Sequence, residues 1–261
     1  MFHKLLKGLA PFAALAMGAA LSGCGDMDLT INGKEGVPLD ELDMSGAAPT
    51  ELVVAANATV IVSEGDTLDI TVEDDPENAL RFVLDEETLG VTRDPNLKIE
   101  DGKATVRVTM PALTSIVIAG SGSVESATMA SNPEIAIGGS GSVSVAQFEA
   151  EKLEISIGGS GNVTGAGSAS RVEVNIGGSG NVDLSGLTTD KAEVSIGGSG
   201  NVMLRSDGEV EANLAGAGDV QVTGSAKCTV NSFGSGKLTC SPADDADDAK
   251  DEREPALTDE S

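Results

Sequence analysis

Apolar and polar positions alternate from residue 118 to residue 238 in a pattern that repeats every 18 to 20 residues. Four columns of each repeat are almost wholly aliphatic, and the positions between them are polar. A glycine-rich motif, "IGGSGNV" in three unchanged copies, divides every repeat; its seven copies begin at residues 118, 137, 157, 176, 196, 214 and 232. Period-two alternation on both sides of a glycine-rich turn predicts a strand, a tight corner and a second strand in each repeat.

A repeat of this length is typical of stacked architectures in which each coil covers its neighbour. We therefore expect an all-β protein, a parallel β-solenoid (β-helix) with about seven coils of 18–20 residues and GSG tight turns. The length differences fall in a second, variable turn, whose versions are "AGSAS", "SGLTTD", "SDGE" and "GSAK". Such variation is expected at a surface corner, and coils about 4.8 Å apart would build a rod of about 29 Å over six steps.

Two glycines mark the tight corner of every repeat. They are Gly120, Gly122, Gly139, Gly141, Gly159, Gly161, Gly178, Gly180, Gly198, Gly200, Gly216, Gly218, Gly234 and Gly236. We expect these residues to adopt positive φ angles at positions where a Cβ would clash.

The segment before the repeat also alternates. "ATVIVSEGDTLDITVED" reads as two strands joined by a turn, and "ALRFVLDEETLGVTRD" and "ATVRVTMPAL" continue in the same style. No stretch has a convincing helical period. We divide the chain into a signal peptide (1–23), a polar tether and lead-in (24–50), the solenoid (51–240) and an acidic tail (241–261) that we expect to be disordered.

The first 24 residues have the order of a bacterial lipoprotein signal. A basic start, "MFHKLLK", is followed by a 14-residue apolar run that is too short for a comfortable transmembrane helix, and then by "LSGC". "LSGC" resembles the lipobox, so we expect lipidation of Cys24 and anchoring to a membrane. Because Gly25 follows the cysteine, the resemblance favours the outer membrane of a Gram-negative cell envelope, on either its periplasmic or its surface face. An ordinary secretory signal with an incidental cysteine is the alternative.

The charge excludes one class of partner. Removal of residues 1–23 takes away His3, Lys4 and Lys7 and no acid, leaving 14 basic and 42 acidic residues, a formal charge of −28. The tail "SPADDADDAKDEREPALTDES" alone holds nine acids and two bases. A chain with this charge repels phosphate, so nucleic acid is not an expected partner.

Two cysteines flank the last tight corner. Cys228 and Cys240 lie six residues on either side of Gly234, in inward columns of strands that face each other. Because the predicted compartment is oxidising, we expect a disulfide that closes the final coil. Two buried free thiols are the alternative, and a metal pair would need further ligands.

The sequence contains no motif that clearly indicates a catalytic or metal-binding site. The calcium-binding nonapeptide has an Asp at the position where this repeat has valine, at Val143, Val163, Val182 and Val202. A phosphate-binding loop is also not indicated, because no Lys and no helix follow the glycines. The chain after residue 23 has no histidine for general base work. We therefore expect no enzyme, no cofactor and no bound metal. Because some β-solenoids, such as pectate lyases, are enzymes, a carbohydrate-active enzyme is the less favoured alternative.

Two outward columns are polar. Glu134, Glu154, Glu173, Glu193 and Glu211 form one, with Lys152, Arg171 and Lys191 beside them. We interpret this face as solvated and self-neutralised, with cation binding as the alternative. The column of Asn162, Asn181 and Asn201 is expected to reflect turn geometry and stacked amide hydrogen bonds.

The alternating entry around "EGD", the run "VTMPALTSI" (108–116) and the repeated GSG turns resemble the GIN domain, a bacterial family of autotransporter-adhesin head domains, over about residues 50–240. The resemblance implies a two-sheet β-superhelix and names no catalytic residue. We expect a lipid-anchored adhesion or scaffold module that contacts a protein or glycan surface. A periplasmic accessory protein that binds a partner is the alternative, and the oligomeric state is open.

Overall fold

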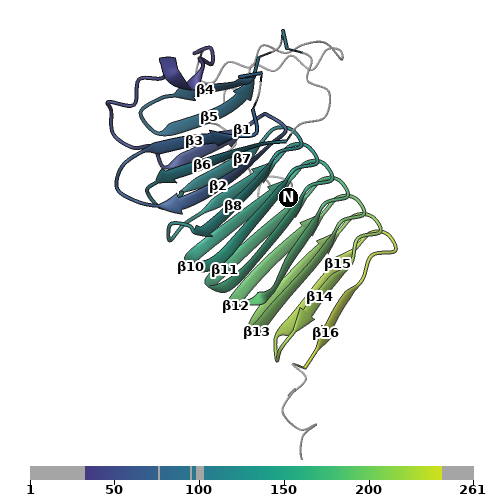
Figure 1. Cartoon of the computed structure of the whole chain (residues 1–261). Helices are drawn as coiled ribbons and strands as arrows, with labels where there is room; N and C mark the ends of the chain where they lie inside the picture. The colour runs from purple at the N-terminus through teal and green to yellow at the C-terminus, as the bar shows by residue number, and fades with distance from the viewer. Residues whose placement is uncertain (1–32, 76, 95, 98–102, 243–261) are drawn as a thin grey trace, which may run out of the picture.

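Parallel strands stacked coil on coil form the body of the protein (Figure 1). This computed structural model describes residues 33–75, 77–94, 96–97 and 103–242. The repeat forms β7 (Ser115–Ile118), β8 (Ser123–Thr128), β9 (Glu134–Ile137), β10 (Ser142–Ile157), β11 (Asn162–Ile176), β12 (Asn181–Ile196), β13 (Asn201–Leu214), β14 (Val220–Thr223), β15 (Lys227–Ser232) and β16 (Leu238–Ser241). The predicted parallel β-solenoid of about seven coils is confirmed.

Equivalent residues of successive coils lie on one another. Ile157 pairs with Ile176 and Ile176 with Ile196, so identical side chains stack in columns as the repeat predicted. Around the second corner the pairing shifts instead, for example between Val145 and Phe148. The variable lengths are therefore absorbed at this corner. The predicted second turn is a bend within one strand, because β10–β13 run through it without a break.

The four aliphatic columns fill the interior. Their members are buried through six coils, down to Val210, Ala212, Leu214 and Val220. The last coil differs, since Val230 is 46% exposed and no further coil covers it among the described residues. Val, Ile, Leu and Ala make up most of this core, which also buries Phe148 on β10.

The tight corners are hydrogen-bonded to the preceding coil. The Gly177 amide donates to the Ile157 carbonyl over 2.8 Å, and the Ser179 amide donates to the Gly159 carbonyl over 2.9 Å. The same contacts recur coil after coil, so the backbone ladder of the strands continues through the turn. Each corner must therefore lie as close to its predecessor as two paired strands lie.

This closeness, and not the predicted positive φ, explains the corner glycines. Among these glycines only Gly234 has a positive φ, at +156°. A Cβ on Gly178 would instead lie 2.9 Å from the carbonyl carbon of Gly159, and one on Gly180 would lie 2.7 Å from the Gly161 carbonyl oxygen. The prediction was right about the clash, except at Gly120, where the nearest atom to a Cβ would be the Ala55 carbonyl oxygen at 3.7 Å, and it was wrong about the backbone conformation.

The N-terminal end is built from a different set of strands. It comprises η1 (Leu39–Glu41, a 3-10 helix), β1 (Glu51–Val54), β2 (Ala58–Glu64), β3 (Asp69–Glu73), β4 (Leu80–Leu84), β5 (Thr88–Arg93) and β6 (Ala104–Met110). β1 and β2 extend the two sheets in parallel, and β3 and β4 close them by antiparallel pairing with β6 and β5. The two strands predicted around "EGD" form, but both pair with β6 and not with each other.

Neighbouring glycines of one corner offer a matched test. We expect Gly178→Ala to lower the free energy of unfolding by about 1–3 kcal/mol, because the new Cβ forces two coils apart. Gly177→Ala should change it by less than about 0.5 kcal/mol, since a Cβ there would meet the Ile157 carbonyl oxygen only at 3.8 Å. Alanine already occupies the equivalent position at Ala119 and Ala215.

Urea denaturation followed by circular dichroism measures both variants. Equal destabilisation by the two substitutions would contradict the proposed role of coil-to-coil contact.

Candidate interaction surface

One outward face of the solenoid carries charged side chains in two parallel columns. The glutamates pair in register from coil to coil, and the basic residues form a column two positions earlier. We call these residues the charged face: Glu134, Glu154, Glu173, Glu193, Glu211, Lys152, Arg171 and Lys191. The columns stand where the sequence predicted, on strands β9–β13, with the spacing of adjacent strands between rows.

Ion pairing on the charged face is concentrated at one residue. The Lys152 ammonium contacts Glu154 on its own strand and lies 3.5 Å from the Glu173 carboxylate of the next coil. Within the described part of the chain, no carboxylate oxygen lies within 4.0 Å of the cationic groups of Arg171 or Lys191. The expected self-neutralisation is therefore local, and both exposed cations are available to another molecule.

Glu134 is the half-buried first member of the glutamate column. Burial raises the pKa of Glu134, the nearby Glu51 carboxylate raises it further, and Lys152 opposes both effects. Glu51 itself accepts a hydrogen bond of 2.9 Å from the Thr88 hydroxyl. This neighbour could not be predicted from the repeat, because Glu51 lies on β1, on the other side of β7 from Glu134, and both glutamates pair with Ser115.

The opposite face carries the predicted asparagine ladder. The Asn181 amide group donates to the Asn162 side-chain oxygen over 3.1 Å, and that of Asn201 donates to Asn181 over 3.0 Å. The ladder continues to the backbone amide of Asp219, which donates to the Asn201 oxygen over 3.3 Å. These side chains satisfy one another, which supports the structural interpretation of the column.

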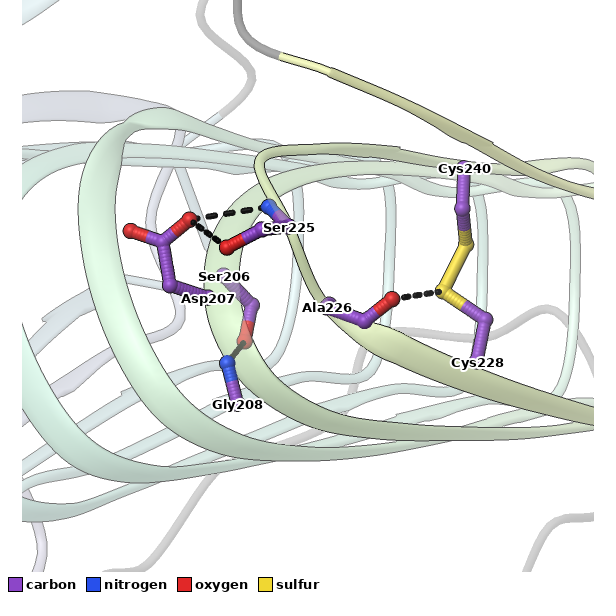
Figure 2. Close-up of a disulfide and its surroundings, with 7 residues drawn as sticks. All are labelled: Ser206, Asp207, Gly208, Ser225, Ala226, Cys228 and Cys240. Atoms are coloured by element: carbon purple, nitrogen blue, oxygen red, sulfur yellow. Dashed lines mark hydrogen bonds between the residues drawn. A yellow bond between two sulfur atoms is a disulfide. The ribbon is translucent and has the colours of Figure 1, made fainter.

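The predicted disulfide between Cys228 and Cys240 closes the last coil (Figure 2). It joins β15 to β16 with Cα atoms 6.8 Å apart. Both cysteines were placed in buried columns, but Cys228 is only partly buried and Cys240 is exposed. The difference arises because, among the described residues, no further coil covers this one.

A second corner next to the disulfide is held by a carboxylate. Asp207 accepts hydrogen bonds from the Ser225 amide over 2.8 Å and from its hydroxyl over 2.9 Å (Figure 2). The Ser225 amide, then its hydroxyl, lower the pKa of Asp207. Beneath it the buried Ser206 hydroxyl donates to the Thr189 carbonyl over 2.8 Å. These contacts shape the bend and offer no reactive group.

Little else in the described part of the chain indicates chemistry at a site. No three His, Cys, Asp or Glu side chains gather there as a metal site would require. No described helix is long and apolar enough to cross a membrane. Cys24, the predicted signal peptide and most of the acidic tail lie outside the described residues, so the predictions about them stand as sequence expectations.

Comparison with known proteins gives one family and several solved structures of similar fold. The profile of a family described as "Putative auto-transporter adhesin, head GIN domain" matches residues 48–226. A search of curated proteins finds no match.

The solved structures that are similar to the chain include the following three crystal structures. A "putative adhesin" from Bacteroides fragilis has a TM-score of 0.69 at 21% identity, covering 75% of this chain and 93% of that one. A "putative lipid binding protein" from Parabacteroides distasonis has a TM-score of 0.60 at 19% identity, covering 76% and 94%. A "putative adhesin" from Parabacteroides merdae has a TM-score of 0.51 at 16% identity, covering 74% and 92%. At these identities the similarity establishes the fold alone.

The position of Glu134 predicts a pH-dependent stability. Its folded-state pKa is raised above the ordinary 4.5, so stability from the protonated form is present below pH 4.5 and is lost as pH rises through the folded-state pKa. Glu134→Gln is neutral at every pH and avoids this loss. We expect the variant to unfold at higher urea concentration than wild type at pH 7, with the difference shrinking toward zero below pH 4.5.

Glu193→Gln is the matched control, because Glu193 stands in the same column but is exposed. A Glu134→Gln advantage that stayed constant between pH 7 and pH 4 would contradict the assigned cause.

Proposed function

The chain belongs to the head GIN domain family, and from that premise we propose a lipid-anchored cell-envelope protein that acts as a non-enzymatic adhesion or interaction module. The family description supports the adhesion part of this proposal. The lipobox-like "LSGC" ending at Cys24 supports the anchor, and Gly25 after it supports delivery to the outer membrane. Several acyl chains on one cysteine would hold the protein on the membrane.

The observation that carries the proposal is the charged face. It presents cations and carboxylates in fixed rows on a sheet whose strands are hydrogen-bonded from coil to coil. Because the backbone is already fixed, little backbone entropy is lost on binding, and the entropic cost is confined to the side chains that the partner immobilises. Arg171, Lys191, Glu193 and Glu211 are exposed, with no ion pair within 4.0 Å among the described residues.

Such an array suits a partner whose charges also repeat, on a protein or a glycan surface. Each single surface ion pair contributes only about 0.2–1 kcal/mol. Several rows that engage at once act as linked weak sites, so the total affinity can exceed that of any one pair many-fold. Adhesion through the charged face should therefore be multivalent and sensitive to salt.

The non-enzymatic part of the proposal is supported by the chemistry of the described residues. They contain no histidine, and their acids do not gather in threes as a metal site would require. The carboxylates with shifted pKa are held by local hydrogen bonds or by burial in the sheet. Asp207 accepts a hydrogen bond from the Ser225 hydroxyl, but its lowered pKa makes it a poor base for activating that serine.

Anchoring and exposure can be tested together on cells. We expect Cys24→Ser to move the protein from the membrane fraction to the soluble fraction, because no acyl chain is attached. With a tag in the acidic tail, protease added to intact wild-type cells should digest the tag while a periplasmic protein stays intact.

Membrane retention of the Cys24→Ser variant would exclude the anchor. Protection of the tag until the outer membrane is breached would place the protein in the periplasm and favour the partner-binding alternative over adhesion.

The charged face is tested by charge reversal. We expect Arg171→Glu with Lys191→Glu to lower adherence of intact cells to a panel of immobilised glycans and proteins at least about tenfold, since two linked sites are lost. Lys103→Glu with Arg205→Glu is the control, because it changes the net charge equally at exposed positions outside the charged face. Equal loss in both double variants would indicate a general charge effect and contradict the assigned surface.

A further inference from the structure

The two ends of the solenoid differ in how far their apolar side chains are covered. At the N-terminal end the terminal strands bury their apolar side chains, with Phe82 on β4 at 1% exposure and Ile70 on β3 at 7%. At the other end Val230 is 46% exposed, although its column is buried in every earlier coil of the repeat; Phe233 is 85% exposed, at a corner position that is exposed in every coil. The core is therefore covered at one end of the stack and open at the other, where β15 and β16 form the last coil (Figure 1).

The open end also has free backbone hydrogen-bonding edges. In the described part of the chain, β15 pairs only with β13 and β16 pairs only with β14, so one edge of each strand has no partner. By contrast, the outer edge of β4 exchanges hydrogen bonds with Val37, between the Val37 amide and the Phe82 carbonyl over 2.9 Å and in the reverse sense over 2.7 Å. Unpaired edges of this kind are templates for pairing with another strand.

The sequence that follows does not supply another coil. Residues 243–261 lack the alternation of aliphatic and polar positions that every coil shows, and they contain nine acids and two bases. Burying that sequence against Val230 would place carboxylates where the columns require aliphatic groups. A segment with the alternating pattern of a coil would suit this surface better than residues 243–261.

We propose that the open end is a docking surface for the same end of a second copy of this chain. A two-fold axis perpendicular to both sheets sets β15 antiparallel to β15 of the second copy and β16 antiparallel to its β16. This arrangement continues both sheets and covers Val230 on each side. It is an isologous contact, which closes as a dimer and does not grow into a fibre.

The second copy is favoured over other occupants by the pattern of the end coil. The disulfide holds the two edge strands of the end coil at a fixed spacing. The end coil of a second copy has the same spacing, so both of its edge strands can pair at once and its core columns lie over those of the first copy. The N-terminal end of a second copy offers no such surface, because Phe82 and Ile70 are already buried and the β4 edge is occupied.

The acidic tail gives the association a characteristic salt dependence. Each copy carries seven excess negative charges in residues 243–261, directly after the end coil, so two docked copies repel one another through their tails. Salt screens this repulsion, with a Debye length that falls from about 30 Å at 0.01 M to about 8 Å at 0.15 M. The dimer should therefore strengthen as salt is added, whereas a contact held by ion pairs would weaken. This proposal does not depend on the proposed adhesive function.

Sedimentation velocity of residues 25–261 tests the proposal at 0.05 M and 0.5 M NaCl. We expect the dimer dissociation constant to fall at least about tenfold at the higher salt. A variant with its tail acids changed to amides should dimerise at both salt concentrations; the changed residues are Asp244, Asp245, Asp247, Asp248, Asp251, Glu252, Glu254, Asp259 and Glu260.

The interface itself is tested by Phe233→Ser with Val230→Thr. Both side chains are already exposed, so the coil should fold while the dimer is lost at every salt concentration. The control is Met203→Ser, which removes an apolar side chain that is 39% exposed on the side of the solenoid and should leave the dimer intact. A tail-neutralised chain that stayed monomeric at 100 µM, or a dimer that survived the Phe233 and Val230 substitutions, would overturn the proposal.

Discussion

The close stacking of the tight corners is the constraint on which the rest of the structure depends. Corner amides donate to carbonyls of the preceding coil, so the β-ladder is not interrupted where the chain turns. Only a residue without a Cβ fits at Gly178 and Gly180, because the preceding glycines lie directly beneath them. Repetition of the motif is therefore a steric requirement of each coil on the next.

The same stacking gives the surfaces their properties. Because coils are locked in register, outward residues form straight columns, and the charged face exists as fixed rows of cations and carboxylates. A stack of this kind also has two ends that need protection. One end is closed by antiparallel strands, whereas at the other the Val230 side chain, from a column buried in the earlier coils, is 46% exposed. Interaction along the side and association at the open end are both consequences of one repeated coil.

The features that could be predicted are those encoded within a single repeat. Period-two alternation was enough to place the buried columns, the outward glutamates and the Cys228–Cys240 pair. Contacts between distant segments could not be read in this way. Examples are the antiparallel pairing of β3 with β6 and the approach of Glu51 to Glu134, which depend on how the first strands join the stack. The exposure of Cys240 was missed because a column predicts which way a residue points and not whether a further coil covers it.

Native-state hydrogen exchange at the corners tests the stacking most directly. The Ser179 and Ser199 amides, which donate to the preceding coil over 2.9 Å each, should exchange as slowly as strand amides such as that of Val182. Slow exchange at the corners is the expected result, because opening them requires separation of whole coils. Exchange at the rate of an exposed loop would show that the corners are not part of the ladder, and the explanation of the glycine repeat would fail.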